Sequence, residues 1–379
     1  MRKFFFSTAI FAVLFTLSSC NPVVIEGENE LYLSEVVPNY IDNTVIPIYK
    51  SLADETVDLY AALVALKASK TDANVQLAAN EWVESRKYWE QSEAFLYGAA
   101  ADFGIDPHID TWPLDKTSLD AELNNATHVE AMAGDDGAAW AGEKLGPALL
   151  GFHGIEYILF EDGQPKSASA ITDNELIYAI AVAGDLRNQC IRLNAAWAGY
   201  DNVSEEKQEI IDEFELVITI GNRQNYGANM KNAGKAGSTY KSFTDAAEDI
   251  IQGCIDIADE VAKMKIGRPY DGTDINYIES PYSHNSTKDF ADNIESIRFA
   301  YLGGVTTRNK SLHTFFAEKN SDLDSKILSA IDNAIAKINA IQDFESDPAS
   351  EASGTAIDAV DALTTLFETA RVELRKTVE

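Results

Sequence analysis

The chain has 379 residues and carries 61 Asp and Glu against 30 Lys and Arg, which gives a formal net charge of −31 at pH 7. A polyanion of this size is a poor candidate for binding nucleic acid or an anionic lipid surface, so neither class of partner is expected. The length is sufficient for two domains.

The first twenty residues have the order of a bacterial lipoprotein signal. Arg2 and Lys3 form a basic segment, and residues 4–17 form an apolar stretch that is too short to span a membrane comfortably. The stretch ends in Leu-Ser-Ser-Cys, which is typical of a lipobox whose cysteine is lipidated after cleavage. We therefore expect a signal peptide at 1–19 and a lipid anchor at Cys20; an uncleaved signal anchor is the alternative.

Position 21 is Asn rather than Asp, which in lipoproteins of Gram-negative bacteria indicates sorting to the outer membrane. We expect the chain to lie in the cell envelope, anchored to the outer membrane and facing either the periplasm or the cell surface. That compartment permits a disulfide bond between Cys190 and Cys254, although their mostly apolar helical surroundings favour buried free thiols.

Beyond the leader, residues 20–32 predict a tether, because they hold Pro, Gly and acids without helical periodicity. From residue 33 onward apolar residues recur at helical spacing, and no alternating strand pattern of any length occurs. The pattern predicts an all-α fold with two tandem domains that resemble four-helix bundles, residues 33–200 and 201–379. The helices are predicted at about 33–63, 72–97, 118–132, 142–160, 173–197, 204–226, 239–263, 288–302, 323–344 and 354–377.

One apolar helix carries a pair of polar side chains. In GFHGIEYILF, residues 151–160, His153 and Glu156 are three residues apart and therefore lie on one face of the helix. Together they offer a nitrogen and an oxygen ligand to a metal ion, which needs at least one further ligand from elsewhere. The simpler alternative is a core histidine that is hydrogen-bonded by Glu156.

A second pair with the same spacing is Glu90 and Glu93, on a helix with apolar and aromatic neighbours. Arg86 lies one turn before Glu90 and can orient a carboxylate. Taken alone, the two glutamates are more often part of a solvated helix face. A single His-containing pair favours a mononuclear site over a ferritin-like dimetal centre.

The loop that follows this helix contains a third candidate group. Asp110 and Asp115 bracket Trp112 and Pro113, and the proline stiffens the loop that would aim a carboxylate. Alternatively, Asp110 is only a turn cap and the Trp-Pro pair a packing corner. His-Glu-x-x-His, the Gly-x-Ser-x-Gly elbow and a phosphate loop after a strand are all absent from the sequence, so the corresponding hydrolases and nucleotide enzymes are excluded.

These segments together resemble the imelysin family. Residues 151–156 match its Gly-x-His-x-x-Glu signature, and the other similar segments follow the order of the family: NYIDNTVIPIYKSL at 39–52, WVESRKYWEQSEAFLYG at 82–98, IDPHIDTWPLD at 105–115 and SIRFAYLGG at 296–304. The likeness covers essentially the whole chain after the leader. The second half has no Gly-x-His-x-x-Glu, so one site per chain is expected.

The resemblance implies two helical bundles and a metal site to which the signature contributes ligands. It implies His153 and Glu156 directly as metal ligands. The other expected ligands are Glu90, Glu93 and Asp115, and the expected pocket residues are Arg86, Trp112, Arg298 and Tyr301.

Three functions are compatible with these features. The first is an envelope lipoprotein that binds a metal ion, or a small ligand that carries one, for uptake, with a transporter as its partner. The resemblance implies iron, divalent or ferric, and zinc is also compatible with the ligand types. The second is a metallopeptidase, the activity after which the family was named. The third is a lipoprotein that binds a ligand without metal or acts as a scaffold.

Overall fold

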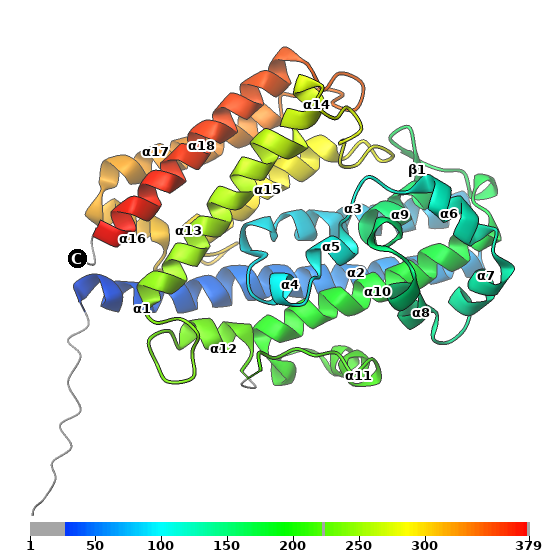
Figure 1. Cartoon of the computed structure of the whole chain (residues 1–379), viewed down its shortest axis with the longest axis horizontal. Coiled ribbons are helices and arrows are strands. Elements are labelled where there is room, and N and C mark those ends of the chain that lie inside the picture. The colour runs from blue at the N-terminus through cyan, green and yellow to red at the C-terminus, as the bar shows by residue number, and fades with distance from the viewer. Residues whose placement is uncertain (1–26, 222–223, 377–379) are drawn as a thin grey trace, which may run out of the picture.

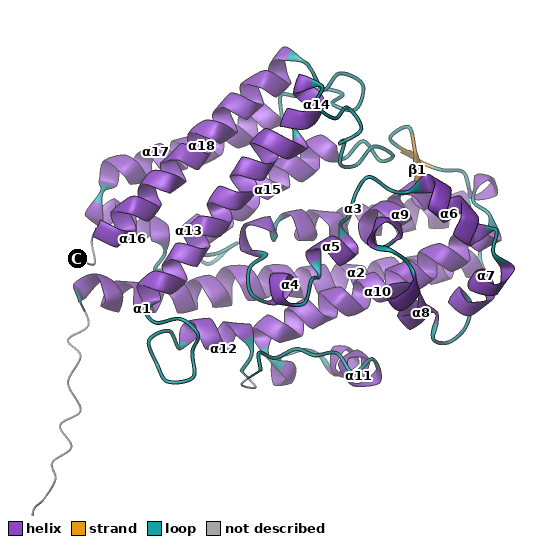
Figure 2. Ribbon diagram, viewed as in Figure 1, coloured by secondary structure: helices purple, strands orange, loops and turns teal. Residues whose placement is uncertain are grey.

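The computed structural model describes residues 27–221 and 224–376. These residues form two packed groups of helices, and the prediction of an all-α fold is confirmed (Figure 1). Strands are confined in the described part to a two-residue antiparallel pair, β1 (Phe160–Glu161) and β2 (Gln164–Pro165) (Figure 2). Among the described residues, every helix is too short or too polar to cross a membrane.

The first group of helices surrounds α10, which packs against α2, α8 and α9, while α3 packs against α2. Thr172 caps α10 through a capping box with Glu175. The principal members are α2 (Ile46–Ala68), α3 (Asp72–Glu90), α8 (Gly137–Lys144), α9 (Gly151–Leu159) and α10 (Asp173–Ala198). Short helices complete the group: α4 (Ala99–Asp102), α5 (Asp106–Ile109), α6 (Lys116–Leu123), α7 (Ala126–Met132), α11 (Glu205–Glu213) and α12 (Tyr226–Lys231).

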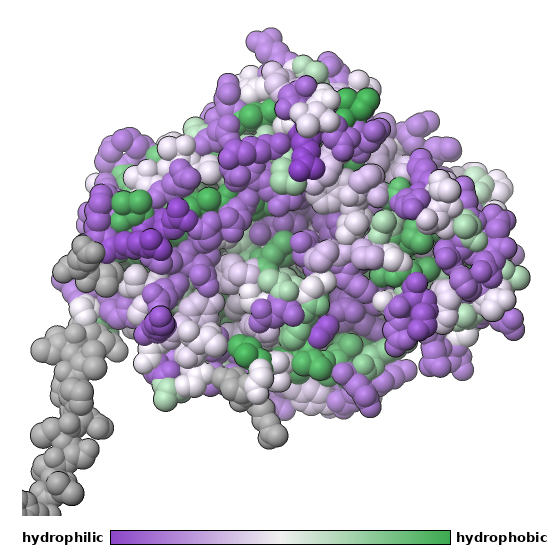
Figure 3. Space-filling view, viewed as in Figure 1, coloured by the Kyte–Doolittle hydropathy of each residue, from purple (hydrophilic) through white to green (hydrophobic). Residues whose placement is uncertain are grey.

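The second group lies beside the first and is built on α18, which packs against α13 and α17 (Figure 1). Its members are α13 (Phe243–Glu260), α14 (Gly267–Asp271), α15 (Ser286–Leu302), α16 (Leu312–Lys319), α17 (Ser321–Ile338) and α18 (Glu351–Lys376). Hydrophilic side chains cover much of the face shown in Figure 3, in keeping with the acidic composition.

The N-terminal helix joins the two groups. α1 (Glu28–Tyr40) packs against α13 and α16 of the second group, and a π-helical turn, Ile41–Val45, leads directly into α2 of the first. The predicted tether at 20–32 is therefore helical from Glu28 onward, while the signal peptide and Cys20 lie outside the described residues. Glu30 accepts hydrogen bonds from the backbone N–H groups of Phe243 and Thr244 at the start of α13. This contact holds the beginning of α1 against the second group, so the residues from Glu28 onward are not a loose linker.

Several predicted helices are shorter in the structure or are divided. The helix predicted at 142–160 is two helices, because the extended backbone at Gly146 and the ring of Pro147 interrupt the backbone hydrogen bonding. The helix predicted at 72–97 ends at Glu90, and that predicted at 204–226 ends at Glu213. Cys190 and Cys254 are buried free thiols in separate helices, so the disulfide alternative is not realised.

Candidate functional site

The site begins on α3, where Arg86 and Glu90 are one turn apart and both side chains are completely buried. Arg86 Nη2 lies 2.5 Å from Glu90 Oε1, and Arg86 Nη1 donates a hydrogen bond to Asp110. Asp110 follows α5 and also accepts a hydrogen bond from Trp89 Nε1 at 2.7 Å. Burial opposes ionisation of Asp110, but the adjacent Arg86 and His153 outweigh it and hold the pKa of this carboxyl well below its usual range.

The Gly-x-His-x-x-Glu signature lies on α9, which approaches α5 and α10 very closely. Gly151 has φ +69°, and a Cβ atom there would lie 1.7 Å from the carbonyl oxygen of Ile109. A Cβ atom on Gly154 would lie 2.2 Å from Tyr178 Oη. Glycine at both positions therefore lets His153 come into contact with Asp110.

His153 lies between two carboxylates. Its Nε2 is 3.1 Å from Asp110 Oδ1, and its Nδ1 is 3.4 Å from Glu156 Oε2. Burial lowers the pKa of His153, but the two carboxylates more than compensate and raise it to about 9. The Nε2 contact lacks hydrogen-bond geometry, whereas the Nδ1 contact has it.

Glu156 faces the loop between α14 and α15. Its Oε1 accepts hydrogen bonds from the backbone N–H of Tyr282 at 3.0 Å and of Ser283 at 2.8 Å, and from Ser283 Oγ at 2.8 Å. One oxygen of this carboxylate therefore fastens the second group of helices to the first, while the other orients His153.

The second group contributes charges that the sequence alone did not reveal. Lys265, at the end of the π-helical turn Val261–Lys265, lies 2.6 Å from Glu279 and 3.4 Å from Glu90. Arg86 Nη2 also lies 2.9 Å from Glu279 Oε1. A lysine among the apolar residues before Ile266 was the available signal in the sequence, but nothing near Glu279 marks it as a partner of α3.

A cavity of about 200 Å³ opens beside Asp110. Glu93 and Asp106 line it, and one oxygen of each lies within 4.8 Å of one oxygen of Asp110. Neither Glu93 nor Asp106 makes a hydrogen bond or an ion pair with any side chain in the described part of the chain. Burial raises the pKa of Glu93 well above its usual range, and burial together with the charge of Asp110 raises that of Asp106 to about 6. The remaining lining residues are Leu96, Pro107, Thr111, Trp112, Glu260, Lys265 and Tyr277.

A second trio of carboxylates, Glu90, Asp110 and Glu279, also lies within 4.8 Å. Arg86 and Lys265 already pair with these groups, so their negative charge is largely balanced. By contrast, Glu93 and Asp106 line the cavity, and neither has a side-chain partner among the residues that the structure describes. The cavity is therefore the part of the cluster with room and unpaired carboxylates for a cation.

The structure brings together most of the predicted site residues. His153, Glu156, Glu90, Glu93 and Arg86 are all buried in this region. Trp112 packs against the His153 ring, with the ring centroids 5.9 Å apart, and lines the cavity.

Three predicted site residues lie elsewhere. Asp115 is exposed, and its carboxylate caps α6 by accepting hydrogen bonds from Ser118, so Asp110 occupies the position in the cluster that was expected of Asp115. Arg298 pairs with Glu295 and Asp332 on α15 and α17. Tyr301 donates a hydrogen bond to Asp324 inside the second group. Arg298 and Tyr301 are thus both held by carboxylates of α17, Asp332 and Asp324, and not by residues of the cluster.

Comparisons of the sequence with known proteins find a matching family model and a related protein. The family model described as imelysin matches residues 45–370. Iron-regulated protein A of Synechococcus elongatus is 28% identical over 273 residues, which are 72% of this chain and 65% of that protein, so the match spans just under two thirds of the relative's length.

Two crystal structures share the fold. A Parabacteroides distasonis protein named as an iron-regulated protein A precursor matches with a TM-score of 0.77 and 28% identity, over 91% of this chain and 95% of that chain. An imelysin-like protein from Psychrobacter arcticum matches with a TM-score of 0.58 and 13% identity, over 92% of this chain and 95% of that chain.

Proposed function

Because this chain belongs to the imelysin family, as its motifs predicted, we propose that it binds iron in the cavity beside Asp110. The observation that carries the proposal is the convergence of Glu93, Asp106 and Asp110 on this cavity, where the first two carboxylates have no partner within the described residues. Buried carboxylates without partners are costly unless a proton or a cation neutralises them. The names of two relatives make iron the first ion to test.

The proposed ligands are the carboxylates of Glu93, Asp106 and Asp110, with His153 as the adjacent nitrogen donor. His153 Nε2 lies beside Asp110 without a hydrogen bond, and Nδ1 is held by Glu156. A histidine whose second nitrogen is fixed by a carboxylate is the usual arrangement around a protein-bound metal ion. Glu156 is accordingly assigned a positioning role, although the sequence suggested it as a ligand.

Peptidase activity receives less support from this geometry. A metal-dependent hydrolase needs a carboxylate or another base that is free to accept a proton from water. Glu156 is the carboxylate of the signature, and its Oε1 already accepts three hydrogen bonds. The two unpaired carboxylates at the cavity, Glu93 and Asp106, are assigned as ligands rather than as a base, so the binding function is preferred over hydrolysis.

The proposal is tested by anaerobic calorimetric titration of the purified chain with ferrous ion, and by titration with ferric citrate. Glu93→Gln and Asp106→Asn keep the size of each side chain while removing its charge, and we expect each to weaken binding at least about tenfold. His128→Ala, which removes a partly exposed histidine paired with Glu122, is the matched control and should bind as the wild type does. Wild-type affinity in both carboxylate variants would contradict the proposal.

From the leader sequence, we also propose that Cys20 carries acyl chains and anchors the chain in the outer membrane. With iron bound in the cavity, the anchored chain would have a transporter as its partner. Replacing Cys20 with serine should abolish labelling by a radioactive fatty acid and move the protein from the membrane fraction to the soluble fraction. Labelling that persists in Cys20→Ser would contradict the anchor.

A further inference from the structure

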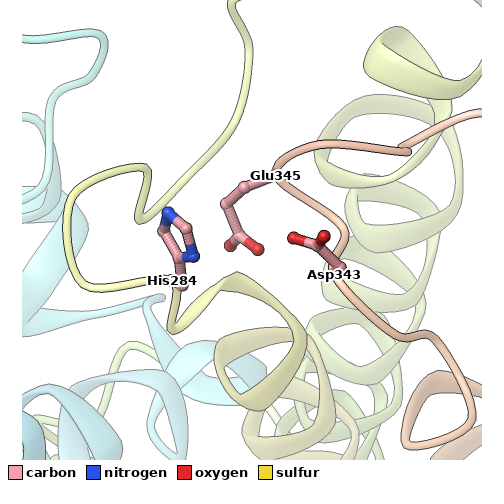
Figure 4. Close-up of side chains that lie close together, drawn as sticks. All are labelled: His284, Asp343 and Glu345. Carbon is pink, nitrogen blue, oxygen red and sulfur yellow. The ribbon is translucent and has the colours of Figure 1, made fainter. Parts of the chain in front are cut away.

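A separate cluster of potential metal ligands lies on the surface of the second group of helices. His284 comes from the loop between α14 and α15, and Asp343 and Glu345 come from the connection between α17 and α18 (Figure 4). One ligand atom from each side chain lies within 4.8 Å of the others. His284 and Asp343 are exposed and Glu345 is half-buried, so the cluster is accessible from solvent.

Within residues 27–221 and 224–376, these three side chains lack other partners. None of them makes a side-chain hydrogen bond or an ion pair with another residue in the described parts of the chain. Glu345 Oε1 is buried, and no donor in the described part of the chain gives it a hydrogen bond. A buried carboxylate oxygen without a donor costs free energy, so the cluster is one positive partner short.

The donor types indicate what that partner is. An imidazole nitrogen combined with carboxylate oxygens suits zinc and other divalent first-row transition ions, whereas calcium and magnesium prefer oxygen alone. Three protein ligands leave at least one coordination position for water. The surface trio Glu55, Asp58 and Glu81 is different, because it offers carboxylates without a nitrogen donor.

We propose that His284, Asp343 and Glu345 bind a divalent transition-metal ion, represented by zinc. This site is separate from the cavity beside Asp110 and does not rest on the proposed function. The ion would connect the α17–α18 connection to the loop that Glu156 holds through Tyr282 and Ser283. Metal binding is therefore expected to restrict the motion of residues 282–285.

The test is calorimetric titration of the purified full chain with zinc, with the absorption spectrum of bound cobalt as a second readout. His284→Asn is the main variant, because His284 has φ +57° and asparagine tolerates this backbone conformation better than alanine does. Glu345→Gln removes the charge of the half-buried ligand and keeps its size. Glu81→Gln in the carboxylate trio is the matched control.

We expect His284→Asn and Glu345→Gln to weaken one class of zinc site at least about tenfold, and to remove the nitrogen-ligand features of the cobalt spectrum. Glu81→Gln and Asp106→Asn should retain this class of site. Zinc should slow amide hydrogen exchange at residues 282–285 in the wild type and not in His284→Asn. Wild-type zinc affinity and cobalt spectrum in both His284→Asn and Glu345→Gln would overturn the proposal, whatever the result for iron.

Discussion

Glu156 of α9 binds Ser283 twice, through the backbone N–H at 2.8 Å and the side-chain hydroxyl at 2.8 Å. The two residues are 127 positions apart in the chain and belong to different groups of helices. Because the same carboxylate also holds His153, it couples the signature helix to the loop of the second group. The glutamate of the signature is thus an element of the interface between the two groups.

Replacing Glu156 with alanine should release this loop. Three hydrogen bonds from the loop to this carboxylate are lost, together with its hydrogen bond to His153, and we expect the free energy of unfolding to fall by roughly 2–4 kcal/mol. Amide hydrogen exchange at Tyr282 and Ser283 should accelerate. Glu156→Gln retains an acceptor and should lose less, and the exposed Glu161→Ala should change neither quantity. Unchanged exchange in Glu156→Ala would show that the loop is held by other contacts.

The close approach of α9 to α5 predicts a strong effect of a single methyl group. Gly151→Ala places a Cβ atom against the carbonyl of Ile109 at a positive φ, and should lower the free energy of unfolding by more than about 2 kcal/mol. Gly146→Ala is a matched control, because its Cβ would meet no atom within 4 Å and its φ is −73°. Urea denaturation followed by circular dichroism measures both. Equal stability of the two variants would contradict the predicted contact.

Lys265 should be important for stability because it balances buried carboxylates. Lys265→Met leaves Glu279 and Glu90 with less positive charge, and we expect a loss of about 3–5 kcal/mol in the free energy of unfolding. Adding Glu279→Gln should recover part of the loss, which a double-mutant cycle would measure. Lys263→Met, two residues earlier and exposed, is the control. Additive effects of the two substitutions would argue against direct coupling.

The ion pair between Asp54 on α2 and Lys207 on α11 predicts a small dependence of stability on pH. Burial raises the pKa of Asp54, but the hydrogen bonds from Lys207 and Lys50 lower it by more. The pKa of Asp54 therefore lies below its usual value. A lowered pKa in the folded state means that the stabilisation is present above pH 4 or so and is lost as the pH falls through the folded pKa.

The stability difference between the wild type and Asp54→Asn should therefore be largest near neutral pH and shrink in acid. Since the Asp54 side chain is 42% exposed, we expect this stability difference to stay under about 1 kcal/mol and to decrease with added salt. Thermal unfolding between pH 3 and pH 7 at two salt concentrations provides the measurement. A difference that grows in acid would mean that the pKa shift has the opposite sign.

Local spacing in the sequence was informative about the fold and about part of the site. Apolar residues at helical intervals predicted most of the long helices, because each helix buries one face regardless of its partner. The three-residue interval of His153 and Glu156 placed them on one face of α9, and the four-residue interval of Arg86 and Glu90 did so on α3. The ends of α8 and α9 were less predictable, since they depend on a Gly-Pro interruption inside an apolar run.

The tertiary structure alone decided which charges meet. Asp110 rather than Asp115 enters the cluster, because the backbone after α5 directs Asp110 toward Arg86 while Asp115 caps α6. Lys265 and Glu279 join α3 across 175 and 193 positions of the chain. Periodicity reports which face of a helix is buried, but pairing between distant segments depends on how the two groups of helices pack. The sequence by itself therefore determined the helices and the signature pair, whereas packing decided the carboxylates, the cations and the cavity that surround them.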